Sequence, residues 1–148
     1  MENENLRLDN HLCFTIYACS REITKLYRPL LAELGITYPQ YLVLQVLFEH
    51  GECTVKELGQ ILYLDSGTLT PLLKRMEEMN LVKRNRRKED ERVVSIQLSD
   101  SGVDVHKKAC KVPMNLFNKS GVEPEEFTKL LAQMKKLLQS VHDANQGT

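Results

Sequence analysis

Two short helical patterns followed directly by a basic hairpin pattern constrain the fold of this chain more than any other feature. Apolar residues in the range 54–62 recur with helical spacing, and the range 65–79 predicts a second helix after a short break. Two β-rich runs at 81–84 and 93–98 then flank a charged tip, as in a β-hairpin. Two helices, a tight turn and a hairpin in this order predict a winged helix-turn-helix.

The segments on both sides of this motif are expected to be helical. Asp9 is a candidate cap for a first helix that runs to about residue 34, and Pro29 predicts a kink or break late in it. Another helix is expected to start at Thr37-Tyr38-Pro39. Helical patterns resume after residue 98, are interrupted near Pro113, and end in a segment whose apolar residues are three and four apart, as in a helix-packing seam.

A chain of 148 residues with 42% hydrophobic residues suits a single domain with a packed core. The expected fold class is mainly α with a small β-hairpin wing. We expect one domain over 1–148, with the winged helix-turn-helix at about 54–98. The helices at about 9–34 and 100–145 have apolar seams that need a partner, which periodicity alone does not identify.

The formal net charge is zero, so a case for nucleic acid depends on local clustering. The hairpin concentrates positive charge within ten residues, at Lys83, Arg84, Arg86, Arg87, Lys88 and Arg92. Such a finger can reach a minor groove or follow phosphates, although charge runs are more often solvated loops. The acidic residues 89–91 interrupt the run, and Asp90 is placed to brace Arg92 through a salt bridge.

The start of the second short helix has the chemistry of a DNA-recognition helix. Its cap is Asp65, Ser66 or Thr68. A helix end of this kind offers free N–H groups and a positive dipole to phosphates, and small residues allow close approach. The candidate DNA-binding residues of the two elements are Ser66, Gly67, Thr68, Thr70, Lys74, Arg75, Arg86, Arg87, Asp90 and Arg92.

The sequence disfavours a membrane-bound or secreted protein and a structural zinc site. No apolar run approaches the roughly 20 residues of a membrane span, and the polar N-terminus lacks signal-peptide features, so we expect a cytoplasmic protein without a membrane partner. The four cysteines are then thiols by default. None forms a CxxC pair, so we expect no structural zinc site and no cofactor.

The sequence resembles the MarR family of bacterial regulators, and in particular its organic-hydroperoxide-sensing, OhrR-like branch. The densest match is the stretch from Leu64 to Glu77, and Asp90-Glu91-Arg92 fits the family's wing signature. Other matching motifs are Leu12-Cys13-Phe14, Tyr17, Ser20-Arg21-Glu22, Tyr27-Arg28-Pro29-Leu30 and Thr37-Tyr38-Pro39-Gln40-Tyr41. The resemblance covers nearly the whole chain and is loosest after about residue 102.

The resemblance implies a homodimer built from the N- and C-terminal helices, which binds a pseudo-palindromic site on double-stranded DNA. It implies that Arg92 enters the minor groove with Asp90 as its brace. It also implies a repressor that leaves its operator when a cysteine is oxidised by an organic hydroperoxide.

The residues of that switch are identified partly from chemistry and partly from the resemblance. Cys13 lies in or just after the first turn of the first helix, where the positive end of the helix favours the reactive anion, although free cysteines are often buried and structural. In the resembled repressors this cysteine reacts with peroxide and is hydrogen-bonded by two tyrosines of the partner subunit, which match Tyr27 and Tyr38. Tyr17 lies one helical turn from Cys13 and can also line the pocket. Cys110 is the candidate resolving cysteine if the oxidised form is an intersubunit disulfide.

Three alternatives remain open. A metal-sensing regulator would use pairs such as His106 and Cys110, which are four residues apart. A regulator released by a small aromatic ligand would leave Cys13 structural. An enzyme such as a thiol peroxidase would use Cys13 catalytically, but no nucleotide loop, nucleophile elbow or paired acid–base cluster accompanies it.

Overall fold

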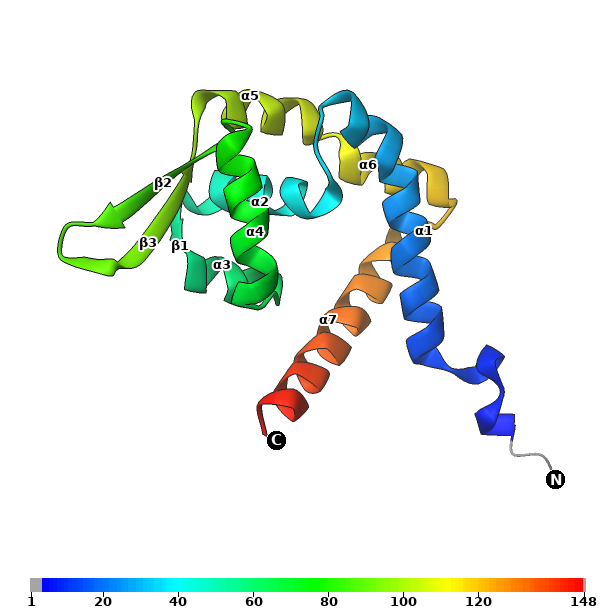
Figure 1. Cartoon of the computed structure of the whole chain (residues 1–148). Coiled ribbons are helices and arrows are strands. Elements are labelled where there is room, and N and C mark those ends of the chain that lie inside the picture. The colour runs from blue at the N-terminus through cyan, green and yellow to red at the C-terminus, as the bar shows by residue number, and fades with distance from the viewer. Residues whose placement is uncertain (1–3, 148) are drawn as a thin grey trace. The chain divides into compact units, whose positions relative to one another are not determined.

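The computed structural model describes residues 4–147, and Figure 1 shows the order of its elements. They fall into two compact units, one up to Val112 and one from Pro113, which are described separately. The elements are, in order, the 3-10 turns η1 (Glu4–Leu6) and η2 (Leu8–Asn10), α1 (Leu12–Glu33), α2 (Tyr38–His50), β1 (Glu52–Thr54), α3 (Val55–Leu62), α4 (Ser66–Glu78), β2 (Val82–Arg87), β3 (Asp90–Leu98), α5 (Asp100–Ala109), α6 (Val112–Ser120) and α7 (Pro124–Gln146). The mainly helical winged helix-turn-helix fold predicted from the sequence is confirmed.

The start of α1 differs from the prediction. Asp9 does not cap this helix, because it lies inside η2, and His11 takes the N-cap position without a side-chain cap. The turn is instead held by the Asn10 side chain, whose Nδ2 donates to the Glu4 carbonyl at 2.7 Å. Cys13 is therefore the second residue of α1.

Pro29 does not break α1, which continues to Glu33. Proline removes the backbone hydrogen bond to the carbonyl four residues earlier, here that of Lys25. Lys25 and Pro29 are both exposed, so water can satisfy that carbonyl, while Tyr27 and Leu31 are buried and hold the helix to the core. Packing therefore outweighs the local cost of the proline.

The helix α2 forms the centre of the first unit. Thr37 and Gln40 form a capping box at its start, in which the Gln40 side chain accepts from the Thr37 amide at 2.9 Å. Val43, Leu44 and Leu47 are almost wholly buried. The helix α2 thus lies in the core of this unit, and α1, α3, α4, α5, β1 and β3 pack against it.

The sheet has a third strand that the sequence pattern did not indicate. Its strand order is β1-β3-β2, with antiparallel pairing throughout, and β1 pairs with β3 through Cys53 and Ile96. Both of these side chains are buried. The hairpin strands are also longer at the tip than predicted, which leaves only Lys88 and Glu89 between them.

The base of the hairpin is locked to the start of α5. The Ser99 amide donates to the Leu81 carbonyl at 3.0 Å, and its hydroxyl donates to the Asn80 carbonyl at 2.6 Å. A Cβ on Gly102 would lie only 2.0 Å from the Leu81 carbonyl oxygen. Glycine is therefore required at this contact between α5 and the hairpin.

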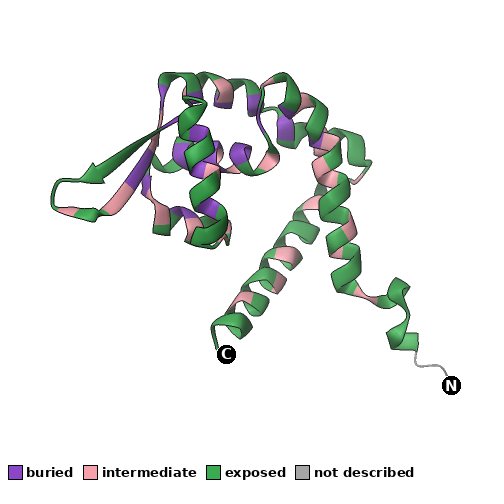
Figure 2. Ribbon diagram, viewed as in Figure 1, coloured by how far each residue is buried: buried purple, intermediate pink, exposed green. Residues whose placement is uncertain are grey.

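The second unit consists of most of α6 and of α7. Pro113 lies in the first turn of α6, where proline is tolerated, so the predicted interruption becomes a new helix start. Phe117 and Phe127 pack edge to face with ring centroids 5.5 Å apart. No residue of α7 that the structure describes is buried, as Figure 2 shows. The large apolar side chains exposed on it are Leu130, Leu131, Leu138 and Val141.

Within residues 4–147, no single helix is long and apolar enough to cross a membrane. Only the pair α1 and α2, bent by 75° at its break, passes on length and composition.

Candidate nucleic-acid interface and cysteine site

The helix α4 has one face in the core and one face free. Leu69, Leu73 and Met76 are fully buried and fix the inner face. The residues predicted to contact DNA are all exposed on the rest of the helix: Ser66, Gly67, Thr68, Thr70, Lys74 and Arg75. Because side chains three and four residues apart share a helix face, Gly67, Thr70 and Lys74 form one continuous exposed stripe. The shape and chemistry of this stripe suit a major groove.

Asp65 is the N-cap of α4, which decides between the three caps considered. Its carboxylate accepts a hydrogen bond from the Thr68 amide at 2.7 Å. This bond lowers the pKa of Asp65, so the cap stays ionised near neutral pH. The cap satisfies one of the free amides at this helix end, and Ser66 and Gly67 stay exposed beside it.

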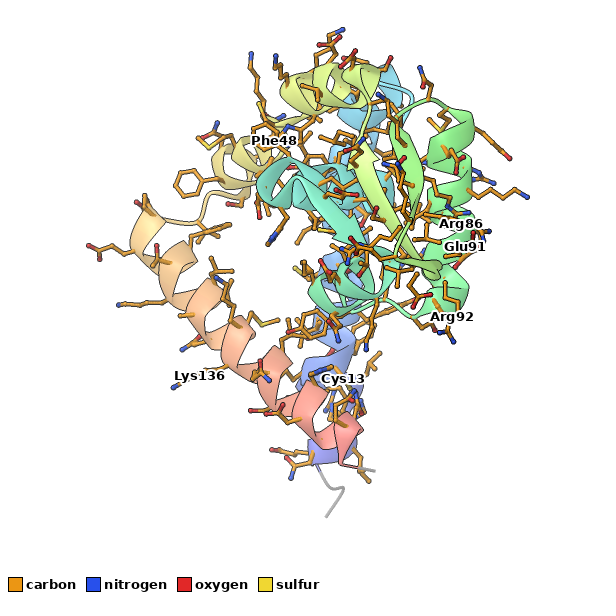
Figure 3. All side chains as sticks on the ribbon, turned by 90° about the vertical axis from the view of Figure 1, so that its left-hand side faces the viewer. Cys13, Phe48, Arg86, Glu91, Arg92 and Lys136 are labelled. Carbon is orange, nitrogen blue, oxygen red and sulfur yellow. The ribbon has the colours of Figure 1, made fainter. Side chains whose placement is uncertain are left out.

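The pairing of the hairpin strands has a register shift just before its tip. Arg86 pairs with Val94 and Arg87 with Asp90, so residues 91–93 have no partners on β2. Asp90 binds Arg92 across this irregular stretch: its Oδ1 lies 3.2 Å from the Arg92 Nε. The Arg92 side chain is otherwise almost fully exposed, at 92%. Figure 3 shows Arg86, Glu91 and Arg92 together on the hairpin.

A contact between the helix and the hairpin was missed by sequence reasoning. Glu77 Oε2 lies 3.6 Å from Arg84 Nε and links the last turn of α4 to β2. One sequence signal pointed to Glu77, because a carboxylate in the last turn of a helix opposes the helix dipole and needs a compensating partner. The partner itself could not be chosen among six hairpin cations without the fold.

Cys13 is exposed near the start of α1, on a surface rich in apolar side chains. Leu12, Phe14 and Tyr17 are exposed by 60%, 41% and 60%. The Tyr17 hydroxyl accepts from Arg21 Nη1 at 3.2 Å, which leaves its own proton available to another acceptor.

Tyr27 and Tyr38 are brought together, but Cys13 of the same chain is far from both. Their rings stack with centroids 5.4 Å apart, and Tyr38 also stacks on Tyr41. Burial raises the pKa of Tyr27 to about 12. Cys13 and Tyr27 lie on one continuous helix, about 21 Å apart along its axis. Contact between them therefore requires a second subunit.

The remaining cysteines occupy three different environments. Cys53 is buried in the sheet, where burial raises the pKa of its thiol, as expected for a structural cysteine. Cys19 is exposed on α1. Cys110 is exposed after α5, and its thiol donates to the Lys107 carbonyl at 3.0 Å.

His106 is a core side chain in the described structure. Its Nε2 lies 2.8 Å from the Gln45 side-chain oxygen, and its ring stacks on Phe48 at 4.2 Å. Residues 4–147 contain no group of three or more His, Cys, Asp or Glu side chains placed to hold a metal ion.

Comparisons with known proteins place this chain in a family. Residues 25–109 match the family described as transcriptional regulator SarA/Rot. The organic hydroperoxide resistance transcriptional regulator of Bacillus subtilis is 48% identical over 98% of this chain and 100% of its own length. AbfR in its reduced form bound to DNA has a TM-score of 0.78 at 35% identity, over 95% of this chain and 99% of that chain; its overoxidised form bound to DNA has a TM-score of 0.73 at 36% identity, with the same coverage.

The fold also matches a more distant structure, that of an Escherichia coli MarR variant with operator DNA. That chain is 23% identical, with a TM-score of 0.80 over 93% of this chain and 99% of its own length. The chain therefore belongs to the MarR family of transcriptional regulators, within the branch of the organic hydroperoxide resistance regulators, and not to a family of enzymes.

Proposed function

We propose that this protein is a homodimeric repressor that binds a pseudo-palindromic site on double-stranded DNA and releases it when Cys13 is oxidised by an organic hydroperoxide. The observation that carries the proposal is the exposed Cys13 thiol near the start of a long helix, beside the exposed apolar side chains of Leu12 and Phe14. The exposed stripe of α4 supplies the major-groove contact, and the hairpin with Arg92 supplies a minor-groove contact.

A second copy of the chain is the proposed partner for the exposed apolar surfaces. Leu6, Leu8 and Leu12 are exposed by 54% to 74% at the N-terminal end, and α7 has no buried residue among those described. Covering such surfaces is favourable by about 25 cal/mol for each Å² of apolar area. A two-fold dimer would also present two recognition helices, which matches a pseudo-palindromic site.

The chemistry proposed at Cys13 is a two-electron oxidation. The thiolate sulfur attacks the terminal oxygen of the hydroperoxide, forming an S–O bond as the O–O bond breaks. Sulfur loses two electrons, the leaving alkoxide takes a proton and departs as an alcohol, and Cys13 becomes a sulfenic acid. A second thiol can then form a disulfide with loss of water. That thiol is Cys110 of the partner subunit or a small cellular thiol, and the cytoplasm would keep both reduced at rest.

The tyrosines are proposed to stabilise the conformation of the dimer in which Cys13 is reduced. Tyr27 and Tyr38 of the partner subunit would donate hydrogen bonds to the Cys13 sulfur, and Tyr17 would line the same pocket. Oxidation changes the size and bonding of that sulfur, so the helices shift and the two recognition helices lose their spacing.

The relatives support an organic hydroperoxide as the effector and the reduced protein as a DNA-binding form. The Bacillus subtilis relative is named for organic hydroperoxide resistance, and reduced AbfR is bound to DNA. Overoxidised AbfR is also bound to DNA. An assay on this protein therefore needs a limited dose of oxidant, which stops at the sulfenic acid or disulfide.

The proposal is tested by binding the reduced protein to DNA from its own promoter region and adding about one equivalent of organic hydroperoxide per subunit. We expect the complex to form, to dissociate on oxidation, and to re-form after addition of a thiol. Cys13→Ser should bind the same DNA and ignore the hydroperoxide. Cys19→Ser, which removes another exposed thiol from the same helix, should respond as the unmodified protein does.

Release of Cys13→Ser by the hydroperoxide would refute the switch at this residue. A non-reducing gel separates the two disulfide routes, because only the Cys110 route gives a covalent dimer. The absence of such a dimer in the responding protein would exclude Cys110 as the resolving cysteine.

A further inference from the structure

The connection between α4 and the hairpin is short, and a backbone hydrogen bond closes it. Only residues 79–81 separate α4 from β2, and the Leu81 amide donates to the Met76 carbonyl at 2.9 Å. Asn80 adopts a left-handed conformation with φ of 60°, and its carbonyl accepts the Ser99 hydroxyl. The base of the hairpin is thereby fixed, whereas the strands beyond it project away from the body, as Figure 1 shows.

One side-chain contact, a salt bridge, links α4 to the hairpin beyond this connection. The pair Glu77–Arg84 is a salt bridge that joins two different elements, α4 and β2. Its two side chains are partly shielded, with exposed fractions of 46% and 32%. Arg84 differs in this respect from Arg92, whose side chain is 92% exposed and whose carboxylate partner lies on its own strand.

We propose that Glu77 and Arg84 form a strut that fixes the angle of the wing relative to α4, so that Arg84 is a positioning residue and not a phosphate contact. The inference rests on the proposed DNA binding. A hairpin held only at its base can swing, and each swing moves Arg92 relative to the stripe of α4. The strut reduces that freedom before DNA is bound, which lowers the ordering cost of binding.

The strut and simple electrostatics predict opposite effects on DNA affinity when the charge of Glu77 is removed. If Glu77 only placed negative charge near DNA, its neutralisation would tighten binding. If Glu77 holds Arg84, its neutralisation weakens binding, by up to about fivefold for each wing given the usual strength of partly exposed pairs. Two wings in a dimer would multiply this to an upper limit of about 25-fold.

The test compares Glu77→Gln, Arg84→Gln, the double variant, and the charge-swapped pair Glu77→Arg with Arg84→Glu. Affinity for the operator is measured over a range of salt concentrations. We expect the two single variants to weaken binding by similar factors, the double variant to be no weaker than either, and the swap to recover affinity. The slope of log affinity against log salt should stay unchanged, because no phosphate contact is lost.

Glu78→Gln is the matched control, since it removes the same charge from the next residue, which makes no salt bridge in the part of the chain that the structure describes. Thermal melting of each variant checks that folding is preserved. The strut is refuted if Glu77→Gln binds as tightly as Glu78→Gln, or if Arg84→Gln alone weakens binding and flattens the salt slope by about 0.9 per lost contact. Failure of the unmodified protein to bind any operator would refute the proposed function instead, so the two failures are distinguishable.

Discussion

Asp90 anchors Arg92 at two points with one oxygen. The same Oδ1 accepts the Arg92 amide at 3.0 Å and the Arg92 Nε at 3.2 Å. The backbone and the guanidinium of one residue are thus fixed by the side chain two positions earlier. The Nη groups of Arg92 stay free to donate, and the side chain extends into solvent.

Replacement of Asp90 by alanine should weaken operator binding by about three- to tenfold, because an unbraced Arg92 loses more rotamer freedom on binding. The measurement is a DNA titration at fixed salt. Glu91→Ala is the control: it removes the same charge from the neighbouring residue, which braces no arginine among the described residues. If Asp90→Ala tightens binding as much as Glu91→Ala does, the brace has no role in DNA binding.

Gly102→Ala should destabilise the fold by about 2 kcal/mol or more, because its Cβ would overlap the Leu81 carbonyl oxygen at 2.0 Å. Gly67→Ala is the contrast, since its Cβ meets nothing closer than 3.6 Å and alanine favours a helix by up to about 1 kcal/mol. Urea unfolding distinguishes the two. Gly67→Ala should nevertheless weaken operator binding if the start of α4 approaches DNA closely, and unchanged affinity would exclude that close approach.

The stability of the protein should fall in mildly acidic solution because of His106. Burial lowers the pKa of this side chain below 6.5, so the unfolded chain takes up a proton before the folded chain does. The contribution of His106 to stability is therefore present above pH 6.5 and is lost as the pH falls through the lower pKa of the folded state. Urea unfolding between pH 8 and pH 5 should show a steeper loss for the unmodified protein than for His106→Phe, which keeps a ring against Phe48. Equal slopes would assign the acid sensitivity to other groups.

Tyr27→Phe should leave folding within about 1 kcal/mol of the unmodified protein, because the stack on Tyr38 is retained. Its DNA complex should form normally but respond differently to hydroperoxide, since one proposed hydrogen bond to Cys13 is lost. The rate of release after a limited dose of oxidant is the measurement. Tyr41→Phe is the control, because Tyr41 belongs to the same stack but has no proposed contact with Cys13. An equal change of rate in both variants would argue for a general packing effect.

Features set by neighbouring residues were predictable. The cap of α4 at Asp65 was among three candidates within four residues, and the brace between Asp90 and Arg92 is two residues long. Local predictions were wrong where packing overrode them. Pro29 was expected to kink or break α1, but the helix does not end there, because the buried side chains of Tyr27 and Leu31 hold it to the core.

The sequence by itself determined the order of helices and hairpin, the exposed stripe of α4 and the positive wing, because these follow from hydrophobic periodicity and short-range hydrogen bonds. Only the tertiary structure decided that Cys53 pairs with Ile96 in a third strand, that Glu77 meets Arg84, and that His106 is buried against Phe48. These contacts join segments distant in the chain. Their geometry depends on how whole elements pack around α2, which no local pattern of residues specifies.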